Sequence, residues 1–289
     1  MEEAHPPKRM TYSQAGVDVD AASRLVDRIK ELARATHRPE VLAGVGPFSG
    51  LFRLSGYRDP VLVASADGVG TKLKIASLLA RYNTVGIDLV NHCVNDILTT
   101  GAEPLFFLDY LASSDLSDEA KTAIVQGMAS ACQATGCALL GGETADMPDI
   151  YGRGDFDLVG FVVGAIERGQ IIDGTAIREG DVLLGLLSSG LHTNGYSLAQ
   201  KALFEFGKLN LEDVPPGLSK PVAEELLTVH RSYGPLVHEL LKQFDLRGIV
   251  HITGGGVFYR CGRQKSLERR GCSAGAQRTK RRTAVPQFP

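Results

Sequence analysis

The chain has 289 residues, of which 44% are hydrophobic and 22% charged, and its formal net charge is −2. This length is enough for two domains, because a single hydrophobic core rarely grows beyond about 250–300 residues. No stretch reaches the 18 apolar residues of a membrane span, and the start of the chain has no apolar signal segment, so we expect a cytoplasmic location and no membrane partner.

The charge is distributed unevenly. Of the 31 basic and 33 acidic residues, residues 257–289 hold nine and one, which leaves 22 and 32 for residues 1–256. An acidic body does not favour nucleic-acid binding, although a short basic arm could bind it. The cysteines are scattered and odd in number, which argues against a disulfide framework and a cysteine metal site; they are Cys93, Cys132, Cys137, Cys261 and Cys272.

Hydrophobic spacing in the first part of the chain predicts alternating helices and strands. A helical pattern over 20–36 stops before Pro39. The apolar runs predicted as strands are 60–65, 103–112, 137–141 and 157–166, and the helical patterns between them are 72–81, 85–100 and 118–135. A polar, turn-rich stretch at 167–181 then predicts a domain boundary.

A second unit follows this boundary. Its predicted elements are a strand at 182–189, a helix at 196–206, a Pro-rich loop, a helix at 231–244 and a strand at 248–253. The mixed order of strands and helices predicts α/β or α+β layers.

The stretch "SADGVGTKLKIA" (65–76) runs from a strand through two glycines into a helix. Such a turn lets backbone N–H groups approach an anion at the positive helix end. Asp67 would then suit a divalent cation that accompanies the anion. The alternative is an ordinary tight turn with a helix-capping aspartate, and the chain contains no G-x-x-x-x-G-K-[ST] pattern.

The helical stretch "VGIDLVNHCVNDILTTGAEP" (85–104) concentrates short polar side chains on one side. At about 100° per residue these lie within roughly a 140° arc; they are Asp88, Asn91, His92, Asn95 and Asp96. A solvated face is the simpler explanation, but Lys, Arg, Glu and Gln, its usual occupants, are absent from this side. Since Asp, Asn and His are poor helix formers, we favour ligand or metal contacts.

A third acidic stretch, "LLGGETADMPDIYGRGDFD" (139–157), leaves a buried strand through Gly142 into Glu143. Together with Asp67 and Asp96, it supplies carboxylates from three separate segments. Several oxygen ligands that converge on a phosphate-bound Mg²⁺ are typical of nucleotide chemistry. A surface residue or a helix cap is the alternative for any single acid.

Two histidines precede glycine-rich turns. His192 lies in "SSGLHTNGYSLAQKAL" (188–203), and His251 opens "HITGGG" (251–256). Each is a candidate general acid or base, and the glycine amides after His251 could wrap a phosphate. A structural histidine and a flexible linker are the alternatives. The glycine loop "LAGVGPFSGLFRL" (42–54) does not have the Rossmann spacing.

Taken together, six segments closely resemble the motifs of the phosphoribosylformylglycinamidine cyclo-ligase family, in the family's order from about residue 11 to residue 256. They are "YSQAGVDVDA", "ADGVGTKL", "GIDLVNHCVNDILTTGAEPLFFLDYLA", "GGETADMP", "SSGLHTNGYSL" and "HITGGG". The resemblance implies ATP-dependent ring closure in purine synthesis. ATP phosphorylates the formyl amide oxygen of formylglycinamidine ribonucleotide, the neighbouring amine attacks the activated carbon, and phosphate leaves.

The resemblance also implies a fold, partners and site residues. The expected fold is α/β of the α+β type, with an ATP-binding and dimerisation domain at 1–170, built on a mixed sheet flanked by helices, and an incomplete α+β domain at 171–256. A homodimer through the N-terminal sheets, ATP and Mg²⁺ as cofactors and K⁺ as a candidate monovalent ion are implied. The implied catalytic residues are Asp96, His192 and His251; the implied metal ligands are Asp67, Asp96 and Glu143; and the implied nucleotide-binding residues are Lys30, Gly46, Gly50, Asp67, Gly68, Gly70, Thr71, Lys72, Asn95, Gly142, Gly254 and Gly255.

The sequence departs from the family at two places. Pro47 interrupts the glycine-rich nucleotide loop, and a proline cannot donate an amide hydrogen bond. After residue 256 the family's phenylalanine–asparagine–glycine motif is missing, and the basic segment 257–289 has a composition typical of disorder. We interpret this segment as the result of a reading-frame shift; a genuine basic arm is the alternative. Uncovered apolar faces and poor solubility or lost activity are the expected consequences.

Other functions remain open from the sequence. A truncated chain that binds ATP without turnover is one alternative, and another ATP-using member of the same superfamily is a second, such as selenophosphate synthetase or thiamine monophosphate kinase. The former should carry a reactive cysteine near its N-terminus, whereas the first cysteine here is Cys93.

Overall fold

The computed structural model of the chain describes residues 19–46, 48–254 and 256. Gly255, Pro47 and the segment 257–289 lie outside these ranges, and so do the predictions made for them. No helix in the described ranges has the length and apolar character that a membrane span requires.

The N-terminal unit is built on a four-stranded mixed sheet with the strand order β3-β6-β4-β5. The pairs β3–β6 and β6–β4 are antiparallel, whereas β4–β5 is parallel. The strands are β3 (Pro60–Gly68), β4 (Glu103–Ser113), β5 (Ala138–Asp146) and β6 (Phe156–Glu167). All four strands were predicted from apolar runs, and the mixed α/β character of the fold is confirmed.

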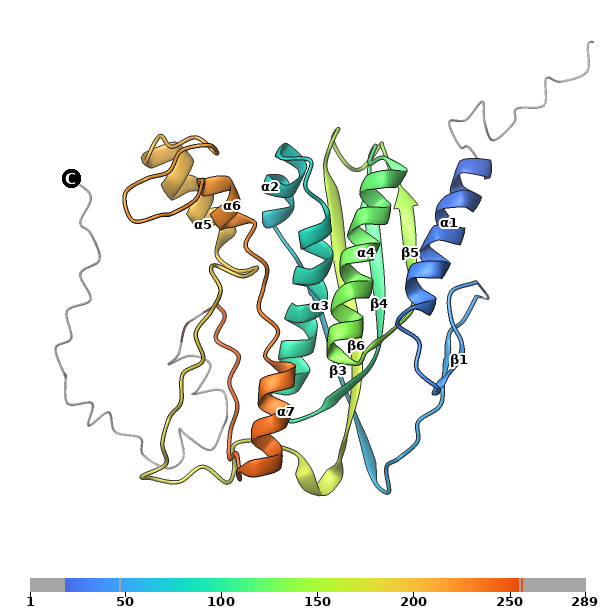
Figure 1. Ribbon diagram of the computed structural model, residues 1–289, viewed down its shortest axis with the longest axis vertical. Coiled ribbons are helices and arrows are strands. Elements are labelled where there is room, and N and C mark those ends of the chain that lie inside the picture. Colours follow the sequence, from blue (N-terminus) through green and yellow to red (C-terminus); the bar gives the residue numbers. More distant parts are fainter. Residues whose placement is uncertain (1–18, 47, 255, 257–289) are drawn as a thin grey trace, which may run out of the picture.

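Helices cover one face of this sheet. The central pair is α3 (Asn83–Leu98) and α4 (Asp118–Thr135), which lie side by side in front of the strands, with α1 (Val19–Arg34) and α2 (Lys72–Leu78) at their flanks (Figure 1). α3 and α4 approach closely because each has a glycine at the crossing: a Cβ atom on Gly86 would meet the carbonyl oxygen of Ile124, and one on Gly127 would meet that of Asn83. The core between helices and sheet includes the fully buried Leu89, Phe107 and Ile124.

The opposite face of the sheet is open. Side chains that alternate with the buried ones point to this side, and among them Leu62 is 61% and Phe161 43% exposed. A short hairpin of β1 (Val41–Ala43) and β2 (Leu51–Phe52), which the sequence did not predict, lies beside β5 and holds the glycine loop between its strands. Exposed apolar faces of this kind are typical of interaction surfaces.

One carboxyl group lies partly buried in the sheet layer, against the neighbouring strand. Asp109 on β4 is paired with Gly142 on β5, and its side chain occupies the space that a Cβ atom on Gly142 would need. Burial, with a smaller contribution from the nearby charge of Glu143, raises the pKa of Asp109 to about 7. Asp109 is therefore protonated in the folded chain at mildly acidic pH.

The raised pKa of Asp109 predicts a pH dependence of stability. The folded-state pKa lies above the ordinary value, so the stabilising contribution is complete below about pH 4 and is lost as the pH rises through about 7. Between pH 5.5 and pH 8, wild type should lose about 2 kcal/mol more of its free energy of unfolding than Asp109→Asn, whose amide does not titrate. Urea denaturation at both pH values measures this, and equal losses in the two proteins would contradict it.

The second unit is helical where the structure gives it regular elements. α5 (Tyr196–Gln200) continues into a π-helical turn, η3 (Lys201–Phe206), and is followed by α6 (Val222–Leu226) and α7 (Gly234–Gln243). A 3-10 turn, η2 (Arg168–Gln170), directly follows β6. The two predicted helices of this unit are confirmed, although α7 begins three residues after the predicted start at 231.

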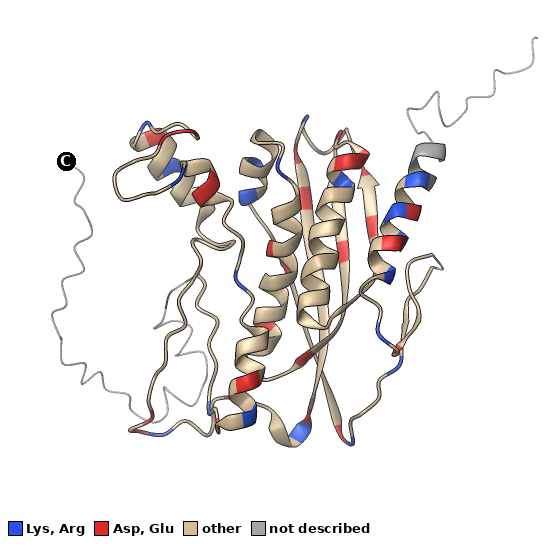
Figure 2. Cartoon of the chain, viewed as in Figure 1, with Lys and Arg blue, Asp and Glu red and all other residues tan. Residues whose placement is uncertain are grey.

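The two strands predicted for the second unit were wrong. Residues 182–189 and 248–253 are extended but belong to no sheet in the described structure (Figures 1 and 2). The apolar composition of a segment favours a strand, but the strand forms only when a neighbouring backbone supplies ladder hydrogen bonds. Both segments lack charged residues (Figure 2), and Val182, Leu183 and Leu187 are 83%, 84% and 82% exposed. The expected uncovered apolar surface is thus confirmed; poor solubility stays a prediction.

Candidate functional site

The polar side of α3 is buried. Asp88 is completely buried, and Asn91, His92 and Asn95 are 6%, 3% and 3% exposed. Their hydrogen bonds run to residues 193, 230, 231 and 233 of the second unit and to Asp67 on β3. A solvated helix face is therefore excluded, and this side of α3 joins the two units of the chain.

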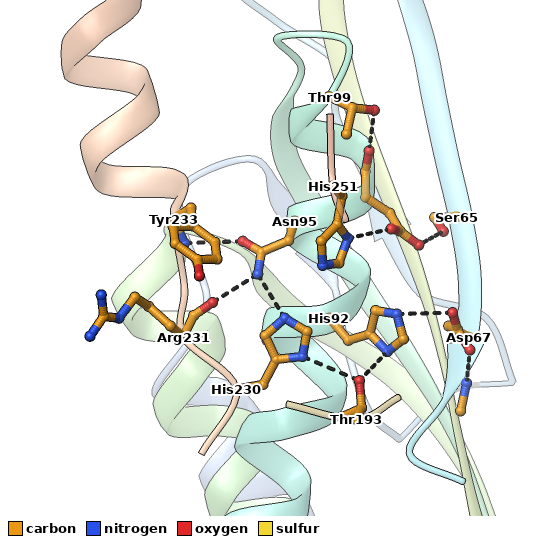
Figure 3. Close-up of polar contacts among 12 residues, drawn as sticks. Ser65, Asp67, His92, Asn95, Thr99, Thr193, His230, Arg231, Tyr233 and His251 are labelled. Atoms are coloured by element: carbon orange, nitrogen blue, oxygen red, sulfur yellow. Dashed lines mark hydrogen bonds and ion pairs between the residues drawn. The ribbon is translucent and has the colours of Figure 1, made fainter. Parts of the chain in front are cut away.

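Two carboxylate–imidazole pairs lie next to one another on this side (Figure 3). Asp67 Oδ2 is 3.0 Å from His92 Nε2, and Asp96 Oδ1 is 2.8 Å from His251 Nδ1. Ser65, two residues before Asp67 on the same side of β3, donates to Asp96 Oδ2 at 3.0 Å. The structure thus brings together Asp67, Asp96 and His251, which are far apart in the sequence.

Both carboxyl groups are ionised near neutral pH. The hydrogen bond from His92 is the main cause that lowers the pKa of Asp67, whose side chain remains 45% exposed. For Asp96, burial acts to raise the pKa, but the hydrogen bond and charge of His251 outweigh it and the pKa lies below its usual range. The site therefore combines two anionic carboxylates with two imidazoles.

His192, a predicted catalytic residue, lies beside this arrangement and is stacked on His230 with ring centroids 4.1 Å apart. Its Nε2 accepts a hydrogen bond from the backbone N–H of Ser189 at 3.1 Å, which leaves the ring proton on Nδ1. Burial lowers the pKa of His192 to about 4 and that of His230 to about 2. Both rings are therefore neutral at pH 7. The backbone of His192 has φ 58°, a left-handed conformation that costs free energy outside glycine.

Thr193 connects two of the histidines, and Asn95 connects α3 to the second unit. The Thr193 hydroxyl lies 2.9 Å from His92 Nδ1 and 3.3 Å from His230 Nδ1. Asn95 donates to the Arg231 carbonyl oxygen at 2.8 Å and accepts from the Tyr233 N–H at 3.0 Å. The side-chain amide of Asn95, which was predicted to contact the nucleotide, thus forms hydrogen bonds with the second unit.

Lys72, also predicted as a nucleotide contact, is completely buried. Its ammonium group lies 2.8 Å from Asp88 Oδ2 and donates to the carbonyl oxygens of Thr228 and His192, at 2.8 and 3.3 Å. Burial lowers the pKa of Lys72 and raises that of Asp88, while each charge opposes the shift of the other. This geometry favours a structural role for Lys72, which holds the loop of His192 against the N-terminal unit.

The turn before Lys72 remains accessible. Gly70 has φ 69°, a left-handed conformation that suits glycine, and both it and Thr71 are exposed. The Thr71 hydroxyl lies 3.2 Å from Ser197 Oγ. Gly68 ends β3 beside Asp67, and Gly254 is exposed after His251. These glycines thus flank the carboxylate–imidazole pairs along the chain.

The remaining predicted residues form a second group at the β5 edge of the sheet. A Cβ atom on Gly46 would lie 3.5 Å from Cε of Lys30, and one on Gly50 would meet Leu140 of β5. Glu143, also on β5, is exposed, and Gly142 precedes it. These residues had been predicted to share one site with Asp67.

The strand order separates the two groups within one chain. Three strand spacings lie between β3 and β5, so Gly68 and Glu143, which stand in the same row across the sheet, are about 14 Å apart. The structure therefore joins Asp67 to Asp96 but leaves Glu143 away from both.

The sequence missed two residues of the site, His230 and Thr193. His230 lies in "TVHRSYG", which has neither helical spacing nor a glycine turn before it, and Thr193 is a single hydroxyl after His192. Asp88 and His92 were found only as members of the polar arc of α3. No local pattern marks His230 or Thr193, whose partners on α3 are 142 and 101 positions away in the chain.

Family models match both units of the chain. The model described as AIR synthase related protein, N-terminal domain, matches residues 50–166, and the C-terminal domain model matches residues 178–263. A phosphoribosylformylglycinamidine cyclo-ligase of Geotalea daltonii is 56% identical over 251 residues, which are 86% of this chain and 72% of the relative. That of Myxococcus xanthus is 55% identical over 249 residues, with the same coverage.

Solved structures share the fold at low identity. E. coli HypE, a hydrogenase maturation protein, is 17% identical with a TM-score of 0.53, and the match covers 82% of this chain and 66% of that one. Thiamine-monophosphate kinase from Stenotrophomonas maltophilia is 21% identical with a TM-score of 0.50 and coverages of 75% and 64%. These likenesses show a common architecture.

Proposed function

The chain belongs to the phosphoribosylformylglycinamidine cyclo-ligase family, and from this membership we propose that it closes the imidazole ring of 5-aminoimidazole ribonucleotide in purine biosynthesis. The reaction consumes ATP and formylglycinamidine ribonucleotide and releases ADP and phosphate. The observation that carries the proposal is the meeting of Asp67, Asp96 and His251, three motif residues from separate segments, at one place.

Asp96 and His251 are proposed to accept the proton that the attacking amine loses. Ring closure requires that this nitrogen lose a proton as it bonds to the activated carbon, and a carboxylate–imidazole pair within hydrogen-bond distance can accept one. Asp96 is anionic and also receives the Ser65 hydroxyl, which fixes its orientation. His192, neutral and oriented by Ser189, is proposed to contact the substrate through the proton on Nδ1.

Asp67 and Asp96 fit a divalent cation, because both are ionised carboxylates that keep 45% and 31% of their side-chain surface exposed. When bound, Mg²⁺ would neutralise charge on the phosphates of ATP. We propose that Gly68, Gly70 and Thr71 contact the nucleotide, supported by their exposure beside Asp67.

A homodimer through the open sheet face is part of the proposal. The exposed apolar side chains on β3 and β6 support it, because a face of this kind is stabilised when a second sheet covers it. Phe161→Asp should therefore shift the protein toward monomer in light scattering. Leu78→Asp is the matched control, since Leu78 is 71% exposed on α2, away from this face. A wild-type monomer, or equal dissociation in both variants, would contradict the proposal.

The function is tested by incubating the full chain with ATP, Mg²⁺ and formylglycinamidine ribonucleotide and following ADP and aminoimidazole product together. Equal amounts of both products are expected. Binding of ATP without either product would instead favour the alternative of a chain that binds ATP but does not turn over.

A further inference from the structure

The two carboxylate–imidazole pairs form a donor set that the proposed reaction does not fully use. One ligand atom each of His92, Asp96 and His251 can be chosen so that all three lie within 4.8 Å of one another. Asp67 Oδ2 lies a further 3.0 Å from His92 Nε2. Two imidazoles and one carboxylate thus lie together, contributed by α3 and the segment that contains residue 251, and Asp67 of β3 lies next to His92 (Figure 3).

The composition of this set differs from that of a magnesium site. Mg²⁺ prefers oxygen ligands, whereas imidazole nitrogen mixed with carboxylate oxygen is typical of Zn²⁺ and Co²⁺. His92 provides the distinction, because it brings a second nitrogen to within reach of Asp96 and His251. Its side chain is only 4% exposed, so the imidazole is held in place by the surrounding protein.

The groups behind the donors are also arranged as in a metal site. A ligating histidine almost always hydrogen-bonds through its other ring nitrogen, which fixes the tautomer and the ring orientation. His92 directs Nε2 toward Asp67, and its Nδ1 lies 2.9 Å from the Thr193 hydroxyl. Asp96 likewise has one oxygen on His251 and the other on the Ser65 hydroxyl. Both donors are therefore oriented before any ion arrives.

We propose that His92, Asp96 and His251 bind a transition-metal ion of the zinc class, with Asp67 as the fourth donor. Binding replaces the hydrogen bond between each imidazole and its carboxylate, and each neutral ring then carries its one proton on the nitrogen that does not bind the metal; for His92 this is Nδ1, beside the Thr193 hydroxyl. Tetrahedral Zn²⁺ needs ligand atoms about 3.3 Å apart, so the set must contract. His251 can supply this movement, because its segment pairs with no strand among the described residues and its side chain is 12% exposed.

The proposal does not depend on the proposed reaction, because the ion is detected directly. Since Asp67 and Asp96 belong to both sites, Zn²⁺ bound here would exclude Mg²⁺ from these carboxylates and the substrate from Asp96. The chain would then be inhibited by zinc-class ions at concentrations at which Mg²⁺ supports turnover.

The test is a titration of the full chain with Co²⁺, followed by visible absorption. We expect the intense spectrum of four-coordinate cobalt at one ion per chain, lost on addition of Zn²⁺ but not of Mg²⁺. His92→Gln and His251→Gln should each weaken Co²⁺ binding at least about tenfold, and Thr193→Val, which removes the hydrogen bond behind His92, about 10- to 100-fold. The matched control is His238→Gln on α7, which should bind Co²⁺ as wild type does.

His251→Gln keeps the test decisive if the buried His92 variant fails to fold, because His251 lies outside the core. A weak six-coordinate cobalt spectrum in wild type would overturn the proposal. So would unchanged binding in both His251→Gln and Thr193→Val.

Discussion

Replacing Lys72 with methionine is expected to lower the free energy of unfolding by about 3–5 kcal/mol, because it leaves the carboxylate of Asp88 buried without its cation. Both side chains are completely buried, and Lys72 also binds the carbonyl oxygens of His192 and Thr228. Loss of the ammonium group therefore removes contacts between the two units as well as the ion pair. Urea denaturation of the full chain measures the effect.

The double variant Lys72→Met, Asp88→Asn separates the two causes. The asparagine amide at position 88 would carry no charge, and its oxygen could still accept the His230 N–H that Asp88 Oδ1 now accepts at 2.7 Å. The double variant should recover part of the lost stability, and the remainder measures the lost contacts to residues 192 and 228. Lys242→Met is the surface control, since its pair with Glu239 is exposed and should contribute less than about 1 kcal/mol. A Lys72→Met variant as stable as this control would contradict the buried-pair interpretation.

Asp96→Asn is expected to lower kcat for ring closure by about 10²- to 10⁴-fold, the range typical for loss of a general acid or base. The amide can still accept from Ser65, but it cannot hold a proton from His251 or from the amine. The measurement is steady-state formation of aminoimidazole product with saturating substrates.

Two comparisons make the Asp96 result specific. Asp173→Asn changes an exposed carboxylate whose partner is the neighbouring Thr175, and it should turn over as wild type does. The free energy of unfolding should fall much less in Asp96→Asn than in Lys72→Met, since Asp96 is partly exposed whereas Lys72 is completely buried. Full activity in Asp96→Asn would remove this residue from the proposed mechanism, and the family assignment would then not extend to its role.

Local patterns were sufficient for the four-stranded sheet of the N-terminal unit, but not for its β1–β2 hairpin. The apolar runs at 60–65, 103–112, 137–141 and 157–166 all lie in strands of the structure. Each run is bounded by turn residues, and the strands pack one face against the helices. The polar arc of α3 was also visible, since helix geometry alone determines which side chains share a side.

Local patterns could not decide whether the segments 182–189 and 248–253 belong to a sheet. Their composition favours extended backbone, and they are extended, but membership of a sheet depends on a neighbour that the segment itself does not specify. The prediction failed at the step from conformation to pairing.

In the candidate site, too, the sequence located some residues and only the tertiary structure revealed the others. Sequence motifs located Asp67, Asp96, His192 and His251, because the residues that belong to one motif are adjacent in the chain. Only the tertiary structure decided that Lys72 forms a buried ion pair with Asp88. Only it showed that Thr193 lies between His92 and His230. It also separated Glu143 from Asp67 by three strand spacings. The physical reason is that burial and contact arise from packing between separate segments of the chain, which no local period records.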